Sequence, residues 1–151
     1  MIVEYIKATG TICAAHYGQE WNASDWTNYE TNNPGQGVIN VSDTYTTTYG
    51  KYIQINDGVG TLHDTTAMDI SVSVSANSLG KYPLVSDNST YLDFTNVPQD
   101  STITVDGTSA GTMDSSGIFR FTAQHAGFYS VAFTKAAHEG QTFEVQASDN
   151  I

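Results

Sequence analysis

A turn glycine followed by strict alternation is the feature that most restricts how this chain can fold. After Gly127, the larger residues Tyr129, Val131 and Phe133 alternate with Phe128, Ser130 and Ala132. Side chains on a strand point to opposite faces in turn, so Tyr129, Val131 and Phe133 share one face. The pattern predicts the penultimate strand of a small β-sandwich. Tyr129 stands where the tyrosine corner of an immunoglobulin-like sandwich is expected.

Further short extended runs surround this strand. Asp106-Gly107 separates two of them and predicts a type I′ hairpin, because both central residues of that turn need positive φ. Counting from residue 66 gives about seven short strands, which predicts an immunoglobulin-like β-sandwich over residues 66–148. No Cys-Trp-Cys set is present, which excludes an antibody-type domain.

The sandwich is predicted to begin with one long amphipathic strand over residues 64–74. Its apolar face carries Met68, Ile70, Val72 and Val74. A short edge strand is expected at residues 84–85.

Residues 1–60 predict a separate, smaller antiparallel β unit that anchors the chain. Runs 1–6 and 11–17 read as a hairpin around Thr9-Gly10, and strands are expected at residues 38–41 and 49–55. Residues 58–67 read as the joint between the two units. One helical turn is predicted at residues 22–26, with Ser24 or Asp25 able to cap it. The fold class is therefore all-β.

Aromatic residues in the polar part of the N-terminal unit are the candidates for binding a partner. Aromatic side chains give a large contact area at low entropic cost, which suits protein interfaces. The alternative is that these rings pack back onto the first hairpin. The candidate residues are Trp21, Trp26, Tyr29, Tyr49 and Tyr52.

The net charge disfavours two kinds of partner, and the cysteine count excludes an intrachain disulfide. Five Lys and Arg against sixteen Asp and Glu give a net charge of −11, which repels nucleic-acid phosphates and anionic lipid headgroups. The single cysteine, Cys13, cannot form an intrachain disulfide. No apolar run reaches the ~20 residues of a membrane-spanning helix, and no signal peptide is evident, so synthesis in the cytosol is expected.

No set of residues predicts catalysis, a metal or a cofactor. The four histidines lack the spacing that would place two ligands on one face, and each reads as a surface or turn residue. Asp87-Asn88 and Asp114-Ser115-Ser116 resemble fragments of calcium loops, but turn formation explains both. We therefore expect a protein that is not an enzyme and needs no cofactor.

Several short motifs of the two units occur together in one known group of proteins. They are Met1-Ile2-Val3-Glu4-Tyr5, Thr9-Gly10, Leu92, Phe94, Val97-Pro98, Thr104-Val105-Asp106-Gly107 and Gly127-Phe128-Tyr129-Ser130-Val131. Through these residues the chain resembles a group of short virion proteins of tailed bacteriophages, in which a small N-terminal β unit precedes an immunoglobulin-like domain. The chain differs from that group after Phe133, where a small polar loop replaces an aromatic, proline-containing one.

This resemblance implies a non-enzymatic structural protein of the phage particle, assembled in the host cytoplasm and present in several copies or as a symmetric homo-oligomer. Its partners would be other tail or capsid proteins. One expectation is a tail-associated adaptor or fibre-attachment protein with an exposed immunoglobulin-like domain. The alternatives are a capsid decoration (cement) protein of the phage head and a carbohydrate-binding module that grips host-surface glycans through Trp and Tyr rings.

Overall fold

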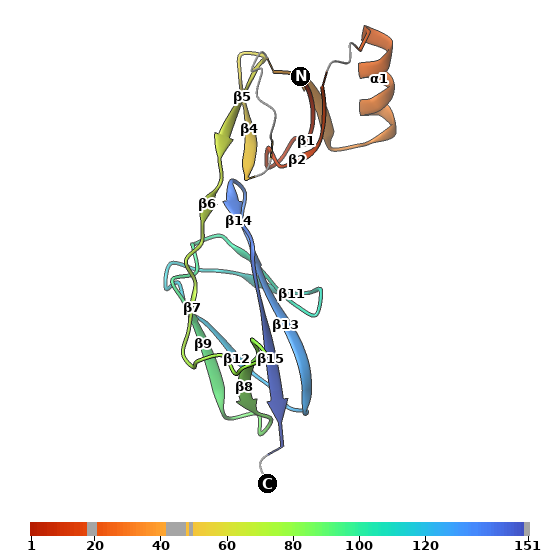
Figure 1. The fold of residues 1–151 in the computed structure, drawn as a ribbon. Coiled ribbons are helices and arrows are strands. Elements are labelled where there is room, and N and C mark those ends of the chain that lie inside the picture. The colour runs from red at the N-terminus through yellow and green to blue at the C-terminus, as the bar shows by residue number, and fades with distance from the viewer. Residues whose placement is uncertain (18–20, 42–47, 49, 150–151) are drawn as a thin grey trace. The chain divides into compact units, whose positions relative to one another are not determined.

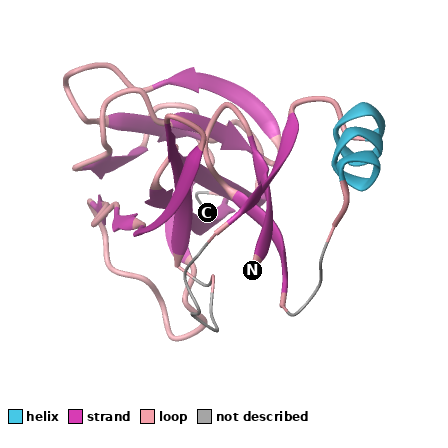
Figure 2. Ribbon diagram, turned by 90° about the horizontal axis from the view of Figure 1, so that it is seen from above, coloured by secondary structure: helices cyan, strands magenta, loops and turns pink. Residues whose placement is uncertain are grey.

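The computed structural model describes residues 1–17, 21–41, 48 and 50–149 and divides the chain into two compact units, Met1–Thr66 and Ala67–Ile151 (Figure 1). Strands hold 52% of the residues and helix 7%, which confirms the all-β fold class. Among the described residues there is one helix (Figure 2).

The N-terminal unit contains a three-stranded antiparallel sheet in the order β2-β1-β3 and a separate β4–β5 hairpin. The predicted first hairpin is confirmed as the β1–β2 pair. The short β6 spans the boundary between the units. The elements are β1 (Ile2–Ile6), β2 (Ile12–His16), α1 (Ala23–Asn32), β3 (Gln36–Asn40), β4 (Lys51–Asn56), β5 (Val59–Asp64) and β6 (Thr66–Ala67).

One face of this sheet holds the small apolar core of the unit. Val3 and Tyr5 of β1 pack with Val41 and with Ile53 of β4. Because side chains alternate along a strand, Glu4 points to the opposite face. The hairpin therefore covers one face of the sheet and leaves the Glu4 face for other contacts.

The helix differs from the prediction of a single turn. α1 runs for ten residues, and its cap is Asn22 rather than Ser24 or Asp25. The Asn22 side chain accepts a hydrogen bond from the Asp25 N–H at 3.0 Å, and the Asp25 carboxylate accepts one from the Asn22 N–H at 2.9 Å. This capping box satisfies two backbone donors at the start of the helix. None of the helix residues is fully buried, so no apolar stripe marked the helix in the sequence.

The N-terminal unit also extends beyond the predicted end at residue 60. β5 occupies part of the expected joint at residues 58–67 and pairs along its whole length with β4. A boundary at residue 60 would cut this hairpin in two, so the unit continues to Thr66.

The C-terminal unit consists of two facing sheets. One is five-stranded, in the order β11-β10-β13-β15-β8, and the other is three-stranded, in the order β12-β9-β7. The β15–β8 pair is parallel, whereas the other pairings described within these two sheets are antiparallel. The strands are β7 (Ser71–Val72), β8 (Tyr82–Val85), β9 (Tyr91–Thr95), β10 (Thr102–Val105), β11 (Thr108–Thr112), β12 (Phe119–Thr122), β13 (Gly127–Thr134), β14 (His138–Glu139) and β15 (Gln141–Ser148).

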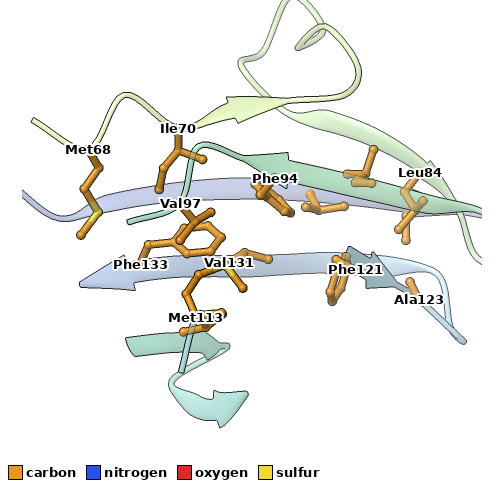
Figure 3. Close-up of a cluster of buried hydrophobic side chains, with 14 residues drawn as sticks. Met68, Ile70, Leu84, Phe94, Val97, Met113, Phe121, Ala123, Val131 and Phe133 are labelled. Atoms are coloured by element: carbon orange, nitrogen blue, oxygen red, sulfur yellow. The ribbon is translucent and has the colours of Figure 1, made fainter. Parts of the chain in front are cut away.

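The core of this unit lies between the two sheets (Figure 3). Phe94 of β9 is its centre, with ring centroids 5.3 Å from both Phe133 of β13 and Phe143 of β15. Val131 and Phe133 are completely buried, as the alternation after Gly127 predicts. Burying apolar surface of this kind contributes about 25 cal/mol per Å² and is the main force holding the sheets together.

The predicted hairpin turn and the predicted tyrosine corner both have the expected geometry. Asp106 and Gly107 both have positive φ, 49° and 78°, as the type I′ hairpin between β10 and β11 requires. The Tyr129 hydroxyl donates a hydrogen bond of 2.8 Å to the His125 carbonyl, a tyrosine-corner contact. Both features agree with an immunoglobulin-like topology, which stays a prediction.

The long strand predicted at residues 64–74 is wrong, although Met68 and Ile70 of its apolar face are placed in the core as expected. After Asp64, the last residue of β5, only β6 and β7 form there, because Asp69 has φ of +55° and turns the backbone out of the extended conformation. Val74, at the end of the predicted strand, is exposed. The Ile70 N–H donates to the side-chain carbonyl of Gln141 instead of to a strand. Met68 and Ile70 are nevertheless buried in the core.

Candidate partner-binding surface

The structure brings three of the five predicted residues together. Trp21 precedes α1, and Trp26 and Tyr29 belong to it; all three are half-buried. Tyr52 lies on β4, where its ring is 5.5 Å from that of His63. The Tyr52 hairpin and α1 contact opposite faces of the sheet, so Tyr52 is not part of the helix cluster. Tyr49 lies outside the described residues.

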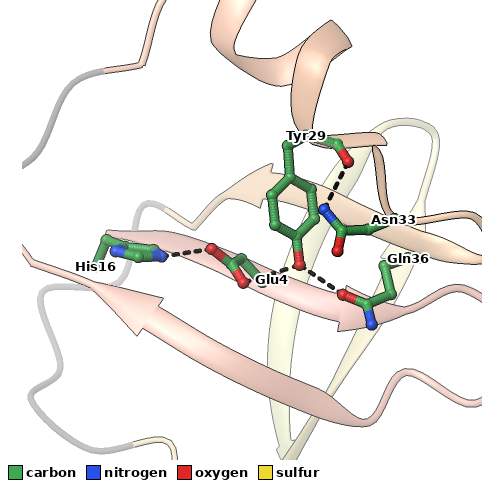
Figure 4. A network of polar contacts seen from close by, with 5 residues as sticks. All are labelled: Glu4, His16, Tyr29, Asn33 and Gln36. Carbon is green, nitrogen blue, oxygen red and sulfur yellow. Dashed lines mark hydrogen bonds and ion pairs between the residues drawn. The ribbon is translucent and has the colours of Figure 1, made fainter. Parts of the chain in front are cut away.

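A polar network joins the helix to the Glu4 face of the sheet (Figure 4). The Tyr29 hydroxyl lies 2.8 Å from Glu4 Oε2 and 2.6 Å from Gln36 Oε1. The hydroxyl has one proton, and the charged carboxylate is the stronger acceptor for it. The other carboxylate oxygen, Oε1, lies 2.6 Å from His16 Nε2. Glu4 thus connects residues from β2 and α1 through its two oxygens.

The aromatic rings lie beside this network. Trp21 is 5.3 Å from the His16 ring and 5.7 Å from the Tyr29 ring, measured between centroids. The Trp26 indole N–H donates to the Trp21 carbonyl at 3.1 Å. Trp21 and Tyr29 therefore pack back onto the first hairpin, which is the alternative that the sequence left open. Trp26 is linked to this pair through its hydrogen bond to the Trp21 backbone.

The network can hold the helix in place. Both carboxylate oxygens of Glu4 already have partners in the chain. The exposed ion pair between Lys7 and Glu30, at 3.0 Å, adds a weak link of roughly 0–1 kcal/mol from the residue after β1 to α1. Among the described residues, no three His, Cys, Asp or Glu side chains lie close enough together to hold a metal ion.

Burial and the neighbouring carboxylate raise the pKa of Tyr29 to about 12. Desolvation is the larger cause, and the hydrogen bond to Glu4 adds to it, since a tyrosinate beside a carboxylate would be repelled. Burial also raises the pKa of Tyr5.

We expect Tyr29 to remain protonated at pH values where exposed tyrosines are already ionised. Its folded pKa lies above the unfolded value of about 10, so its contribution to stability is complete below pH ~10 and is lost as pH rises towards about 12. A titration followed by tyrosinate absorbance should show a late phase, which Tyr29→Phe reduces. A late phase of the same size in Tyr29→Phe would contradict the network.

Sequence reasoning missed Glu4, His16 and Gln36 as members of this cluster. The sequence predicts a surface or turn position for His16, whereas this residue is half-buried at the end of β2. The signal was the hairpin register: His16 pairs with Ile2, and Glu4 is its diagonal neighbour on the same face. Gln36 enters through β3, whose pairing with β1 is not a local property of the sequence.

No helix among the described residues has the length and apolar character that crossing a membrane requires. The chain has no significant match among protein-family models, curated proteins or solved structures.

Proposed function

We propose that this chain is a non-enzymatic structural protein of a tailed-bacteriophage particle, tail-associated as an adaptor or fibre-attachment protein, with α1 and the aromatic residues Trp21, Trp26 and Tyr29 as the contact with the particle. The observation that carries the proposal is a capped ten-residue helix none of whose residues is fully buried. The helix is held by the Glu4 network on one side, so its remaining surface is available for a partner.

The sequence resemblance supplies the class of particle, and the two-unit organisation agrees with it. One unit would anchor the chain, and the other would be displayed on the assembled virion as an immunoglobulin-like domain. A preformed, rigid aromatic contact suits assembly in many copies or as a symmetric homo-oligomer, because little side-chain entropy is lost on binding.

Trp26→Ala is expected to lower the incorporation of the chain into particles at least about tenfold, since truncating one aromatic anchor at an interface often costs 2 kcal/mol or more. Particles would be assembled in cells that supply the chain or the variant, purified, and analysed by quantitative mass spectrometry. The matched control is Phe128→Ala, an exposed aromatic residue of the other unit.

Equal incorporation of Trp26→Ala and the unchanged chain would refute the helix as the contact. A chain that is absent from purified particles would refute the virion assignment itself. Locating a labelled copy on intact particles by electron microscopy distinguishes the tail from the head, where the chain would be a decoration protein instead.

Carbohydrate binding is the second candidate, favoured by the partly exposed rings beside α1. Sugars stack on an open aromatic face, but Trp21 already contacts His16 and Tyr29. Trp26 would therefore have to supply the platform. A glycan array that shows specific saccharide binding, lost in Trp26→Ala, would favour this function over the structural one.

A further inference from the structure

The C-terminal unit has an apolar pocket where β8 of one sheet approaches β9 of the other. Its volume is about 190 Å³. The floor is formed by core residues, since Leu84 is 4% exposed and Leu92 is 1% exposed. The lining residues are Val74, Pro83, Leu84, Val85, Thr90, Tyr91, Leu92 and Ser148.

One wall of the pocket is fixed in position. The Tyr91 ring is 46% exposed, and the Arg120 guanidinium carbon lies 3.6 Å from its centroid. Asp93 holds that guanidinium through two contacts, Nε–Oδ1 at 2.8 Å and Nη2–Oδ2 at 2.9 Å. This arrangement combines a cation–π contact with a bidentate ion pair. The Tyr91 ring is therefore already ordered, and a ligand that binds beside it costs little side-chain entropy.

Two carboxylates lie next to the lining residues. Asp87 accepts hydrogen bonds from the Ser89 and Thr90 N–H groups and, at 2.8 Å, from the Thr90 hydroxyl. These bonds hold the pKa of Asp87 well below its usual range. Asp149 follows Ser148 and accepts from the Ser86 hydroxyl at 2.9 Å. Because Arg120 is neutralised by Asp93, the surroundings of the pocket are net negative.

The size of the pocket limits what it can hold. A dry apolar cavity of about 150 Å³ accepts a benzene ring, whereas pockets for drug-sized ligands begin at about 300 Å³. The observed volume of about 190 Å³ thus suits one leucine or phenylalanine side chain. The nearby carboxylates favour positive charge on either side of that residue.

We propose that this pocket binds a single apolar side chain of a partner protein, presented in a segment that carries Lys or Arg on both sides of it. This inference concerns a different unit from the contact under Proposed function and does not depend on it. It assigns a binding role to the sandwich, for which the proposed function names no partner.

The test is a titration of the full-length, isotope-labelled chain followed by NMR. The probe is the peptide acetyl-Lys-Leu-Lys-amide. Saturable shifts are expected at the methyl groups of Val74, Leu84, Val85 and Leu92. The two comparison peptides are acetyl-Lys-Ala-Lys-amide and acetyl-Glu-Leu-Glu-amide, each expected to bind at least about tenfold more weakly, because one lacks the apolar side chain and the other the charge complementarity. Binding of the first peptide should also weaken as salt is added.

Variants separate the pocket from the rest of the surface. Val74→Phe, which fills the pocket from its rim, should abolish the methyl shifts, whereas Ile118→Phe, at another exposed apolar position, should not. Asp149→Asn should weaken the binding severalfold, because Asp149 follows the lining residue Ser148. Asp100→Asn, at an exposed aspartate whose sequence neighbours do not line the pocket, should have no effect.

Four outcomes would overturn the proposal. The first is the absence of saturable shifts at the pocket methyls, and the second is equal binding of the alanine peptide, which would mean a purely electrostatic contact. The third is equal binding of the glutamate peptide, which would remove the basic partner. The fourth is concentration-dependent self-association of the chain without peptide that moves the same methyls, which would make a second copy the occupant.

Discussion

Phe94→Ala is expected to destabilise the C-terminal unit by about 3–5 kcal/mol, the cost of removing a large aromatic side chain from a packed core. Phe94 is 0% exposed and contacts Phe119 on the neighbouring strand of its own sheet, and Phe133 and Phe143 on the facing sheet. Such a loss is a large fraction of the total stability of about 5–15 kcal/mol of an ordinary domain.

Urea unfolding of Phe94→Ala, followed by backbone amide NMR signals of β9 and β13, measures this effect. The control is Phe128→Ala, which removes the same side chain at a position that is 65% exposed and is expected to cost less than ~1 kcal/mol. Both tryptophans lie in the N-terminal unit, so tryptophan fluorescence follows the unfolding of that unit separately from the loss of the C-terminal core. Similar losses for the two variants would mean that the core is not centred on Phe94.

Gly10→Ala is expected to have the largest effect on the N-terminal unit. Gly10 has φ of +71°, and a Cβ atom there would lie 2.1 Å from the Ile53 carbonyl oxygen. The Ile53 N–H also donates to the Gly10 carbonyl at 2.8 Å, so this turn connects the first hairpin to β4. An added methyl group must push β4 away and break that connection.

Gly35→Ala separates the two causes of this loss. Gly35 has φ of +83°, but a Cβ atom at that position would meet nothing within 4 Å. It should therefore show only the backbone cost of a left-handed residue, about 1–2 kcal/mol. Gly10→Ala should cost clearly more, and tryptophan fluorescence during thermal unfolding reports both. Equal midpoints for the two variants would show that the close approach to Ile53 contributes nothing.

The strands that form the sandwich core were predictable because their information is local. Val131 and Phe133 are buried by simple alternation, and the Asp106-Gly107 turn follows from the φ that its two residues tolerate. The one long strand that was wrong failed at Asp69, where a single residue of positive φ interrupts the alternating pattern, although Met68 and Ile70 on either side of it stay in the core.

The helix was underestimated for a different reason. Periodicity identifies a helix by its buried stripe, and α1 has none. Its stability comes from the Asn22–Asp25 capping box and from the hydrogen bond that the Tyr29 hydroxyl donates to Glu4 of β1. The first is readable from neighbouring residues, but the second depends on a contact with a distant strand.

By itself, the sequence determined the all-β class, the apolar alternation of the core strands, their tight turns and the excess of negative charge, since each depends on residue type and near neighbours. Only the tertiary structure decided that Glu4, His16, Tyr29 and Gln36 meet, that Trp21 is used to hold the helix, and that a pocket opens between β8 and β9. These features arise from strand register and from the packing of distant segments, which no local pattern encodes.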